Sequence, residues 1–160
     1  MKKTVILLFG GRSSEYEVSL SSAFGALENI DTEKYNVVKV GITRDGKFYL
    51  YEGENSLISE NKWIAEGKCT PLSLDLEKGC FTAGDREIRP DAVLPMIHGK
   101  NCEDGTLQGM LTLMKIPVAG CGCTSSAVCM DKAFAKAIIN SETKINQAKA
   151  VVIRAEDYTP

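Results

Sequence analysis

Apolar and polar residues alternate along the chain in blocks that are typical of an α/β protein. The apolar run TVILLF at residues 4–9 ends in two glycines, which predicts a buried parallel strand. From about residue 14 to residue 30 the pattern changes to helical spacing, with Leu20, Phe24 and Leu27 on one stripe. The apolar segment YNVVKVGI at 35–42 predicts a second strand.

The rest of the chain continues this alternation. Residues 43–51 predict the return strand of a hairpin, because Asp45-Gly46 supplies the positive φ angles of a tight turn. The middle of the chain, residues 52–90, is patterned less clearly. The further expected elements are a short helix around Trp63, strands at 72–76, 80–88 and 91–99, a helix at Gly105–Met114, a short strand at 116–120, a long helix at Ser125–Asn140 with Ala127, Met130, Phe134 and Ile138 on its apolar face, and a last strand at 148–153.

This order of elements predicts a three-layer α/β domain with a mainly parallel sheet. Ligands of such sheets gather at the carboxyl ends of the strands. The loops that begin at Gly10-Gly11 and at His98-Gly99 both follow apolar strands, so the sequence predicts that they share this edge.

Charge and composition narrow the classes of function. The 160 residues carry 19 Lys and Arg against 21 Asp and Glu, a balance that does not favour a nucleic-acid partner. The longest apolar runs are too short to span a bilayer, and no signal-peptide pattern follows the two N-terminal lysines. We therefore expect a cytoplasmic protein without a membrane partner.

The six cysteines do not form a metal-binding pattern. None belongs to a C-x-x-C pair, and His98 is the only histidine that could help them. In a chain of this kind they are expected to be reduced, small apolar residues, and no bound metal is expected.

The first loop, FGGRSSEYEVS at residues 9–19, begins like a phosphate-binding loop but lacks the third glycine of the dinucleotide pattern. Ser14 and Glu17 have the spacing of a capping box. Glu15 is then left in the first turn, where its charge would repel a phosphate and attract an ammonium group. The sequence thus favours a small cationic or zwitterionic ligand such as an amino acid. The alternative is an ordinary acidic residue at a helix N-terminus.

Two further segments carry candidate chemistry. In LPMIHGKNCEDGTLQG (94–109), His98 follows a strand and Asp104 is placed to cap the next helix. A histidine there can donate a hydrogen bond to an oxyanion or orient a carboxylate, although a structural role is the alternative. In GCGCTSSAVCMDKAFAK (120–136), Thr124 or Ser125 can cap the long helix. Lys132 is either a solvated surface residue or a phosphate ligand.

Together these segments resemble the N-terminal domain of the D-alanine–D-alanine ligases. The resemblance is carried by LFGGRSSEYEVSLSSA, HGKNCEDGTLQGMLTLMKIPVAGCG and SSAVCMDKAFAK, in this order and separation. It covers the chain from Lys3 to about Ala137. The middle, with GITRDGKFYLYE and NKW, is similar to the longer first domains of the family, including its D-alanine–D-serine and D-alanine–D-lactate relatives.

The resemblance implies a preATP-grasp domain at residues 1–140, with 141–160 as the start of a truncated ATP-grasp region. It implies an ATP- and Mg²⁺-dependent ligase of peptidoglycan and cell-wall synthesis, which joins two D-amino acids through an acyl phosphate, and it implies a homodimer. Carried over residue by residue, the resemblance implies that Glu15 binds the ammonium of the first D-alanine and that His98 lies near the acyl-transfer centre. It implies that Ser13 and Glu103 lie near the substrate and that Lys132 contacts a nucleotide phosphate.

Some features depart from the family pattern. Cys102 stands where glycine is common, and NSETKINQAKAVVIRA lacks the usual glycine and prolines. The ATP-grasp lysines and the magnesium ligands are not in these 160 residues, so we expect no dipeptide synthesis by this chain alone. The alternatives are a stand-alone amino-acid-binding or dimerisation module, a flavodoxin-like or receiver-type switch, and a nicotinamide-binding domain. A receiver needs an acidic pair after its first strand, and a nicotinamide-binding domain needs a third glycine in its first loop. This chain has neither feature.

Overall fold

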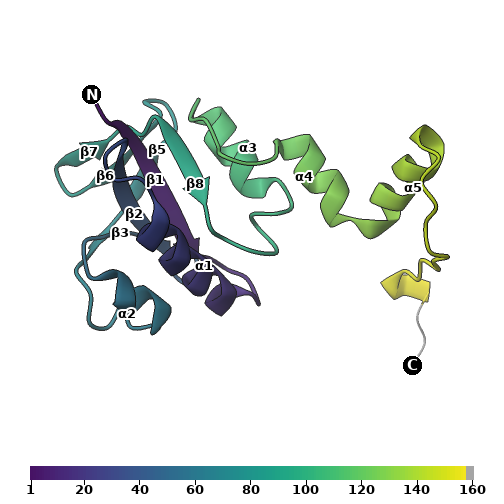
Figure 1. Ribbon diagram of the computed structural model, residues 1–160, viewed down its shortest axis with the longest axis horizontal. Helices are drawn as coiled ribbons and strands as arrows, with labels where there is room; N and C mark the ends of the chain where they lie inside the picture. The colour runs from purple at the N-terminus through teal and green to yellow at the C-terminus, as the bar shows by residue number, and fades with distance from the viewer. Residues whose placement is uncertain (158–160) are drawn as a thin grey trace.

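The structure is a computed structural model that describes residues 1–157 (Figure 1). Strands and helices alternate through the first two thirds of the chain, and helices follow. The elements are β1 (Lys3–Gly10), α1 (Tyr16–Asn29), β2 (Tyr35–Ile42), β3 (Phe48–Tyr51), α2 (Asn55–Ser59), β4 (Cys69–Pro71), β5 (Ser73–Asp75), β6 (Cys80–Ala83), β7 (Arg86–Ile88), β8 (Ala92–Pro95), α3 (Thr106–Leu113), α4 (Cys123–Met130), α5 (Lys132–Glu142) and the 3₁₀ helix η1 (Ala155–Asp157).

The larger sheet has the strand order β4-β3-β2-β1-β8. Strand β1 lies between β2 and β8 and is parallel to both, whereas β2–β3 and β3–β4 are antiparallel. The α/β class is confirmed, but the sheet is mixed rather than mainly parallel, because the hairpin after Ile42 reverses the chain. In that turn Gly46 has a φ of +88° and donates its N–H to the Thr43 carbonyl.

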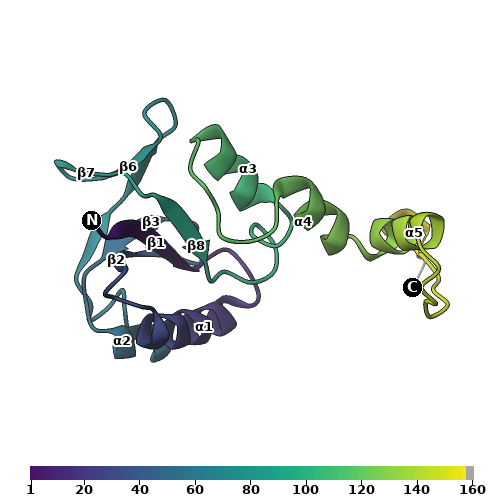
Figure 2. The ribbon, with the colours of Figure 1, turned by 45° about the horizontal axis from the view of Figure 1, so that its top comes forward.

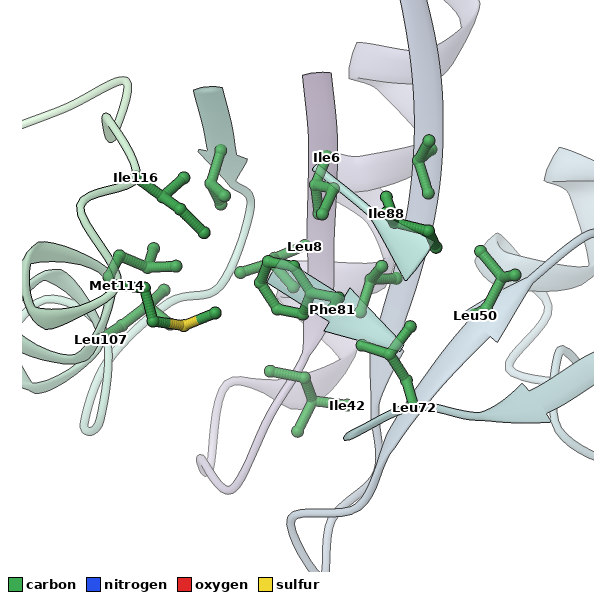
Figure 3. Packing of buried hydrophobic residues seen from close by; sticks show 14 of the residues in the cluster. Ile6, Leu8, Ile42, Leu50, Leu72, Phe81, Ile88, Leu107, Met114 and Ile116 are labelled. Atoms are coloured by element: carbon green, nitrogen blue, oxygen red, sulfur yellow. The ribbon is translucent and has the colours of Figure 1, made fainter. Parts of the chain in front are cut away.

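Two apolar layers enclose this sheet, as the sequence predicts. Figure 2 shows α1 and α2 on one face of the sheet and α3 with β6 and β7 on the other. Leu7 and Phe9 of β1 face α1 and α2, where they pack with Leu20, Ile58 and Trp63. The alternate residues of β1 face the smaller sheet β5-β6-β7 and helix α3. Figure 3 shows this second layer, with Ile6, Leu8, Phe81, Leu107 and Met114 among its labelled side chains.

Trp63 lies at the centre of the first layer, but it is not in a helix. Helix α2 ends at Ser59, and Trp63 follows in a turn with only 1% of its surface exposed. Its indole N–H donates to the Tyr16 hydroxyl over 2.9 Å, so the buried polar ends of both rings are paired. The expected short helix is therefore real but precedes this residue, and Trp63 is fixed by packing.

The expected long helix at 125–140 is broken into α4 and α5. The break is at Asp131, which has extended backbone angles (φ −86°, ψ 107°). Its carboxylate accepts hydrogen bonds from the N–H groups of Ala133 and Phe134, and Thr124 and Ser125 do not cap α4 through their side chains. An aspartate that can cap a new helix competes with continuation of the old one, which explains the break.

The two short strands expected late in the chain are not formed as predicted. Segment 116–120 makes a single parallel bridge, between Val93 and Val118. Residues 148–153 form no strand, and Val151, Val152 and Ile153 are exposed. A strand needs a neighbour to complete its hydrogen bonds, and none of the described residues supplies one here. Within residues 1–157, no helix has the length and apolarity to cross a membrane.

Candidate functional site

A buried serine joins the parts on which the candidate site is built. Ser19 of α1 is fully buried, and its hydroxyl accepts a hydrogen bond from the Gly10 N–H (2.8 Å) and donates one to the Met96 carbonyl (2.7 Å). Gly10 ends β1, and Met96 directly follows β8. One hydroxyl thus ties helix α1 to the carboxyl ends of two parallel strands, and the two candidate loops start from there.

The first loop places Glu15 at the start of α1, but not through the expected capping box. Helix α1 begins at Tyr16 with Glu15 as its N-cap, so Ser14 lies outside the helix. The Ser13 hydroxyl accepts the Glu15 N–H over 3.0 Å. Glu17 is paired with Arg44 of the β2–β3 turn rather than with the loop backbone. Arg44 also stacks on the Tyr16 ring, 4.1 Å from its centroid, and so fixes this first turn.

The second loop passes directly against the first at Gly99. This residue is buried and has a φ of +72°, which favours glycine. A Cβ atom there would collide with Oε2 of Glu15 and would lie 2.8 Å from Oγ of Ser13. The structure therefore brings Ser13 and Glu15 next to the residue that follows His98, although Glu15 itself is exposed.

His98 lies three residues beyond the end of β8, because the ladder between β8 and β1 stops at Pro95. Its Nε2 is 2.8 Å from the Ser22 hydroxyl of α1, and its Nδ1 is 3.7 Å from Oε1 of Glu103. The second distance is too long for a hydrogen bond. About one third of the His98 side chain is exposed, so the ring is held at one edge and accessible at the other.

Asp104 fixes the loop that carries Glu103. Its carboxylate accepts the N–H groups of Asn101 (2.9 Å) and Thr106 (3.0 Å). Burial alone would raise the pKa of Asp104, but these backbone hydrogen bonds outweigh it and hold the pKa below the ordinary value. The N-cap residue of α3 is Gly105, so the expected capping by Asp104 takes the form of a bond to Thr106.

Two more contacts define this loop. The Asn101 side-chain amide donates to the Arg12 carbonyl over 2.9 Å, which links the second loop to the first. Cys102 is only 4% exposed and packs into the apolar core. Burial, with smaller contributions from Glu103 and Asp104, raises the pKa of its thiol to about 11. The cysteine that departs from the family pattern is therefore a neutral core residue, and all six cysteines are free.

An apolar cavity of about 180 Å³ lies where the two loops meet the β2–β3 turn and α3. Its walls include Arg12, Phe48, Ile97 and Leu107. None of Ser13, Glu15, His98 and Glu103 lines it. The polar candidates therefore form an open cluster beside the strand ends rather than the wall of an enclosed pocket.

Lys132 is not part of this cluster. It is an exposed residue at the start of α5, where its ammonium is 3.4 Å from the Cys129 carbonyl. Figure 1 shows α5 well separated from α1 and β8. Across residues 1–157, no three Cys, His, Asp or Glu side chains gather in a way that could hold a metal ion.

Sequence reasoning missed two residues that hold the site, Ser19 and Ser22. With Glu15 they have the spacing i, i+4 and i+7, which places the three on one face of α1. Small hydroxyl residues on a helix face that must pack against strand ends are a usable signal, because only a partnered polar group is tolerated there.

The comparisons with known proteins cover the part of the chain that carries the candidate site. The family model described as D-ala D-ala ligase N-terminus matches residues 4–121, which include both strands and both loops of the candidate site. The chain belongs to the D-alanine–D-alanine ligase N-terminal family. Ser13, Glu15, His98 and Glu103 all lie within the residues that the family model matches.

Individual relatives match nearly all of this chain. The D-alanine–D-alanine ligase of Clostridium novyi (strain NT) is 42% identical over 99% of the chain, which spans 44% of that relative. Among solved structures, the VanG D-Ala:D-Ser ligase from Enterococcus faecalis is 43% identical with a TM-score of 0.83, over 88% of this chain and 42% of that one. A D-alanine–D-alanine ligase from Bacillus anthracis, complexed with ATP, is 28% identical with a TM-score of 0.56, over 88% of this chain and 36% of that one. The chain thus spans less than half the length of these relatives.

Proposed function

We propose that this chain is the part of an ATP-dependent D-alanine–D-alanine or D-alanine–D-serine ligase that binds the first D-amino acid. The observation that carries the proposal is the gathering of Ser13, Glu15 and His98 around Gly99. In this assignment Glu15 binds the ammonium group, and His98 donates a hydrogen bond to a carboxylate oxygen. Ser13 and Glu103 border the same ligand.

Charge supports a zwitterionic ligand over a polyanion. Glu15 is exposed at the helix N-terminus, and the Glu103 carboxylate lies 3.7 Å from the imidazole. Two carboxylates in one cluster make it favourable for an ammonium group and unfavourable for a phosphate. The donors Ser13 and His98 then remain for the carboxylate of the same amino acid.

The reaction proposed for the complete ligase is peptidoglycan dipeptide synthesis. ATP phosphorylates the carboxylate of the first D-amino acid, and the amine of a second amino acid displaces the phosphate. For the first step, this chain's contribution is to hold the carboxylate in place. Lys132 is proposed to contact a nucleotide phosphate in the complete enzyme, although here it lies on a separate helix. The residues described here do not fit a Mg²⁺ site by themselves, so no step is assigned through the metal.

Binding of D-alanine, D-lactate and L-alanine to the 160-residue chain tests the proposal. D-Lactate has a hydroxyl in place of the ammonium group, so it cannot form an ion pair with Glu15. We expect D-alanine to bind at least about tenfold more tightly than D-lactate, the size expected for a hydrogen bond to a charged group. Calorimetry measures all three. Equal binding of D-alanine and D-lactate would contradict the assignment of Glu15.

An activity assay tests the expected limit of this chain. The carboxylate and the ATP phosphate must be held side by side for phosphoryl transfer. His98 follows β8 and Lys132 begins α5, and Figure 1 shows these two elements well apart. We therefore expect no phosphate release above background when the chain is incubated with ATP, Mg²⁺ and D-alanine. Phosphate release that depends on D-alanine would contradict this expectation.

The other family properties are proposed on the resemblance alone. These are the homodimer, the cytoplasmic location, and the division into a domain at 1–140 and the start of an ATP-grasp region at 141–160. Sedimentation equilibrium tests the first of them. A mass of one chain at all concentrations would contradict the homodimer for this chain.

A further inference from the structure

His98 is held by a residue to which the sequence analysis assigns no role. The Ser22 hydroxyl of α1 lies 2.8 Å from Nε2 of His98, and both side chains are partly buried. The contact joins residues 76 positions apart in the sequence, so it is a product of the fold. It is also direct and short, whereas the nearest charged group, Glu103, stays 3.7 Å from the opposite ring nitrogen.

The surroundings of Ser22 favour one direction for this hydrogen bond, with Ser22 as the donor. A serine inside a helix commonly donates its hydrogen to the carbonyl four residues earlier. Within residues 1–157 the Ser22 hydroxyl has no partner besides His98, whereas Ser19 donates to the Met96 carbonyl. The Ser22 hydrogen is therefore available to Nε2, and a nitrogen that accepts a hydrogen bond does not carry a hydrogen of its own.

The other ring nitrogen points to the same conclusion. A carboxylate near an imidazole favours the hydrogen on the nitrogen that faces it, and Glu103 faces Nδ1. At 3.7 Å Glu103 is too far from Nδ1 to accept a hydrogen bond from it. Glu15 and Ser13 lie against Gly99, the residue that follows His98. An Nδ1–H would therefore be directed toward the cluster and remain free to bind a ligand oxygen.

We propose that Ser22 is a positioning residue that holds neutral His98 in the Nδ1–H tautomer by donating to Nε2. The donor that His98 presents to the cluster is then Nδ1–H, and its acceptor is a carboxylate oxygen of the bound D-amino acid. The second half of this statement depends on the proposed function. The first half depends only on the contacts of the free chain.

Nitrogen NMR of the imidazole tests the first half directly. His98 is the only histidine, so its ring gives one set of signals without assignment problems. At a pH where the ring is neutral, the expected pattern is a protonated Nδ1 and an unprotonated Nε2. A ring that is mainly Nε2–H in the unmodified chain would overturn the proposal.

Three variants separate positioning from a general effect on the fold. Ser22→Ala removes the donor, and we expect the ring to shift toward the Nε2–H tautomer. Ser22→Thr keeps a hydroxyl and is expected to restore the Nδ1–H pattern. The matched control is Ser21→Ala, which changes the exposed neighbour on the same helix and is expected to leave the pattern as it is. An unchanged tautomer in a folded Ser22→Ala chain would also overturn the proposal.

Calorimetry with D-alanine tests the second half on the same proteins. Because Ser22→Ala removes one hydrogen bond that positions His98, we expect this variant to bind D-alanine about 3- to 10-fold more weakly. Ser22→Thr and Ser21→Ala should bind D-alanine with nearly the affinity of the unmodified chain. If the unmodified chain shows the expected tautomer but binds no D-alanine, the proposed function fails and the positioning of His98 stands. If D-alanine binds but Ser22→Ala binds it equally well, the positioning role in binding is wrong and the proposed function stands.

Discussion

Two regions of the chain differ in how their apolar residues are used. The body, residues 3–116, contains both apolar layers and nearly every buried side chain. In the arm, residues 120–157, Ser126 is the only buried residue among those described, and Phe134 and Ile138 are exposed on α5. The four polar candidates that meet at the strand ends belong to the body, whereas Lys132 belongs to the arm.

The comparison shows what an apolar stripe does and does not establish. Helix α1 and helix α5 both carry the spacing of an amphipathic helix. The stripe of α1 packs on β1, and it therefore positions Glu15 and Ser22. The stripe of α5 contacts no core within residues 1–157. Periodicity predicts that a helix forms. The apolar stripe stabilises the fold and fixes a site only where it packs against another element.

The largest difference between the regions is expected for a matched pair of phenylalanines. Phe81 is fully buried in the layer of Figure 3, and Phe134 is 65% exposed. Phe81→Ala should lower the free energy of unfolding by about 3–5 kcal/mol, because it opens a cavity in the core. Phe134→Ala should change it by less than about 0.5 kcal/mol. Urea unfolding measures both, and similar losses would contradict the division into body and arm.

A pair of serines makes the same comparison for buried hydrogen bonds. Ser19→Ala leaves the Gly10 N–H and the Met96 carbonyl without their partner, and we expect a loss of about 1–3 kcal/mol in the free energy of unfolding. Ser141 of α5 is exposed and bonds only within the last turn of its helix. Ser141→Ala should cost less than about 0.5 kcal/mol. A smaller loss for Ser19→Ala than for Ser141→Ala would contradict the role of Ser19 at the strand ends.

The cysteines give a third comparison with a smaller effect on stability. Because the pKa of the Cys102 thiol is raised from 9.0 to about 11, the unfolded chain loses this proton at lower pH than the folded chain does. Its contribution to the free energy of unfolding is therefore complete below about pH 9 and decreases as the pH rises toward 11. In Cys102→Ala, the free energy of unfolding should therefore fall less between about pH 9 and pH 11 than it does in the unmodified chain. Urea unfolding at a series of pH values measures this difference.

Alkylation of the folded chain checks the same difference at neutral pH. The exposed Cys121, Cys123 and Cys129 of the arm should react with iodoacetamide well before the buried Cys80 and Cys102 of the body. Peptide mass spectrometry after timed quenching gives the order. Early modification of Cys102 would show that the second loop is open in solution.

The body was also the part that the sequence predicted well. Strand β1, the β2–β3 hairpin and helix α3 follow from local pattern, because each buries its apolar face within the domain. The errors in the arm have one cause. Competing local hydrogen bonds decide whether a helix ends at Asp131, and the presence of a neighbouring strand decides whether residues 148–153 pair. The periodicity of the sequence gives neither kind of information.

The candidate site was predicted in part. Glu15 and His98 were expected from their position after apolar strands, and the fold brings Glu15 next to Gly99, the residue that follows His98. The contacts of Ser19 with Met96 and of Ser22 with His98 were missed, because they join positions 77 and 76 residues apart. The capping box at Ser14 was wrong, because Arg44 from the β2–β3 turn binds Glu17 instead. The roles of Ser13, Glu15, His98, Glu103 and Lys132 in ligand binding stay predictions.

The most direct test of the account is the D-alanine affinity of Glu15→Gln beside Glu17→Gln. Both variants remove one negative charge from the start of α1, but only Glu15 lies against Gly99, and Glu17 is engaged with Arg44. Calorimetry should show D-alanine binding at least about tenfold weaker for Glu15→Gln, with a much smaller change for Glu17→Gln. Equal affinities of Glu15→Gln and the unmodified chain would contradict the claim that this carboxylate binds the ammonium group.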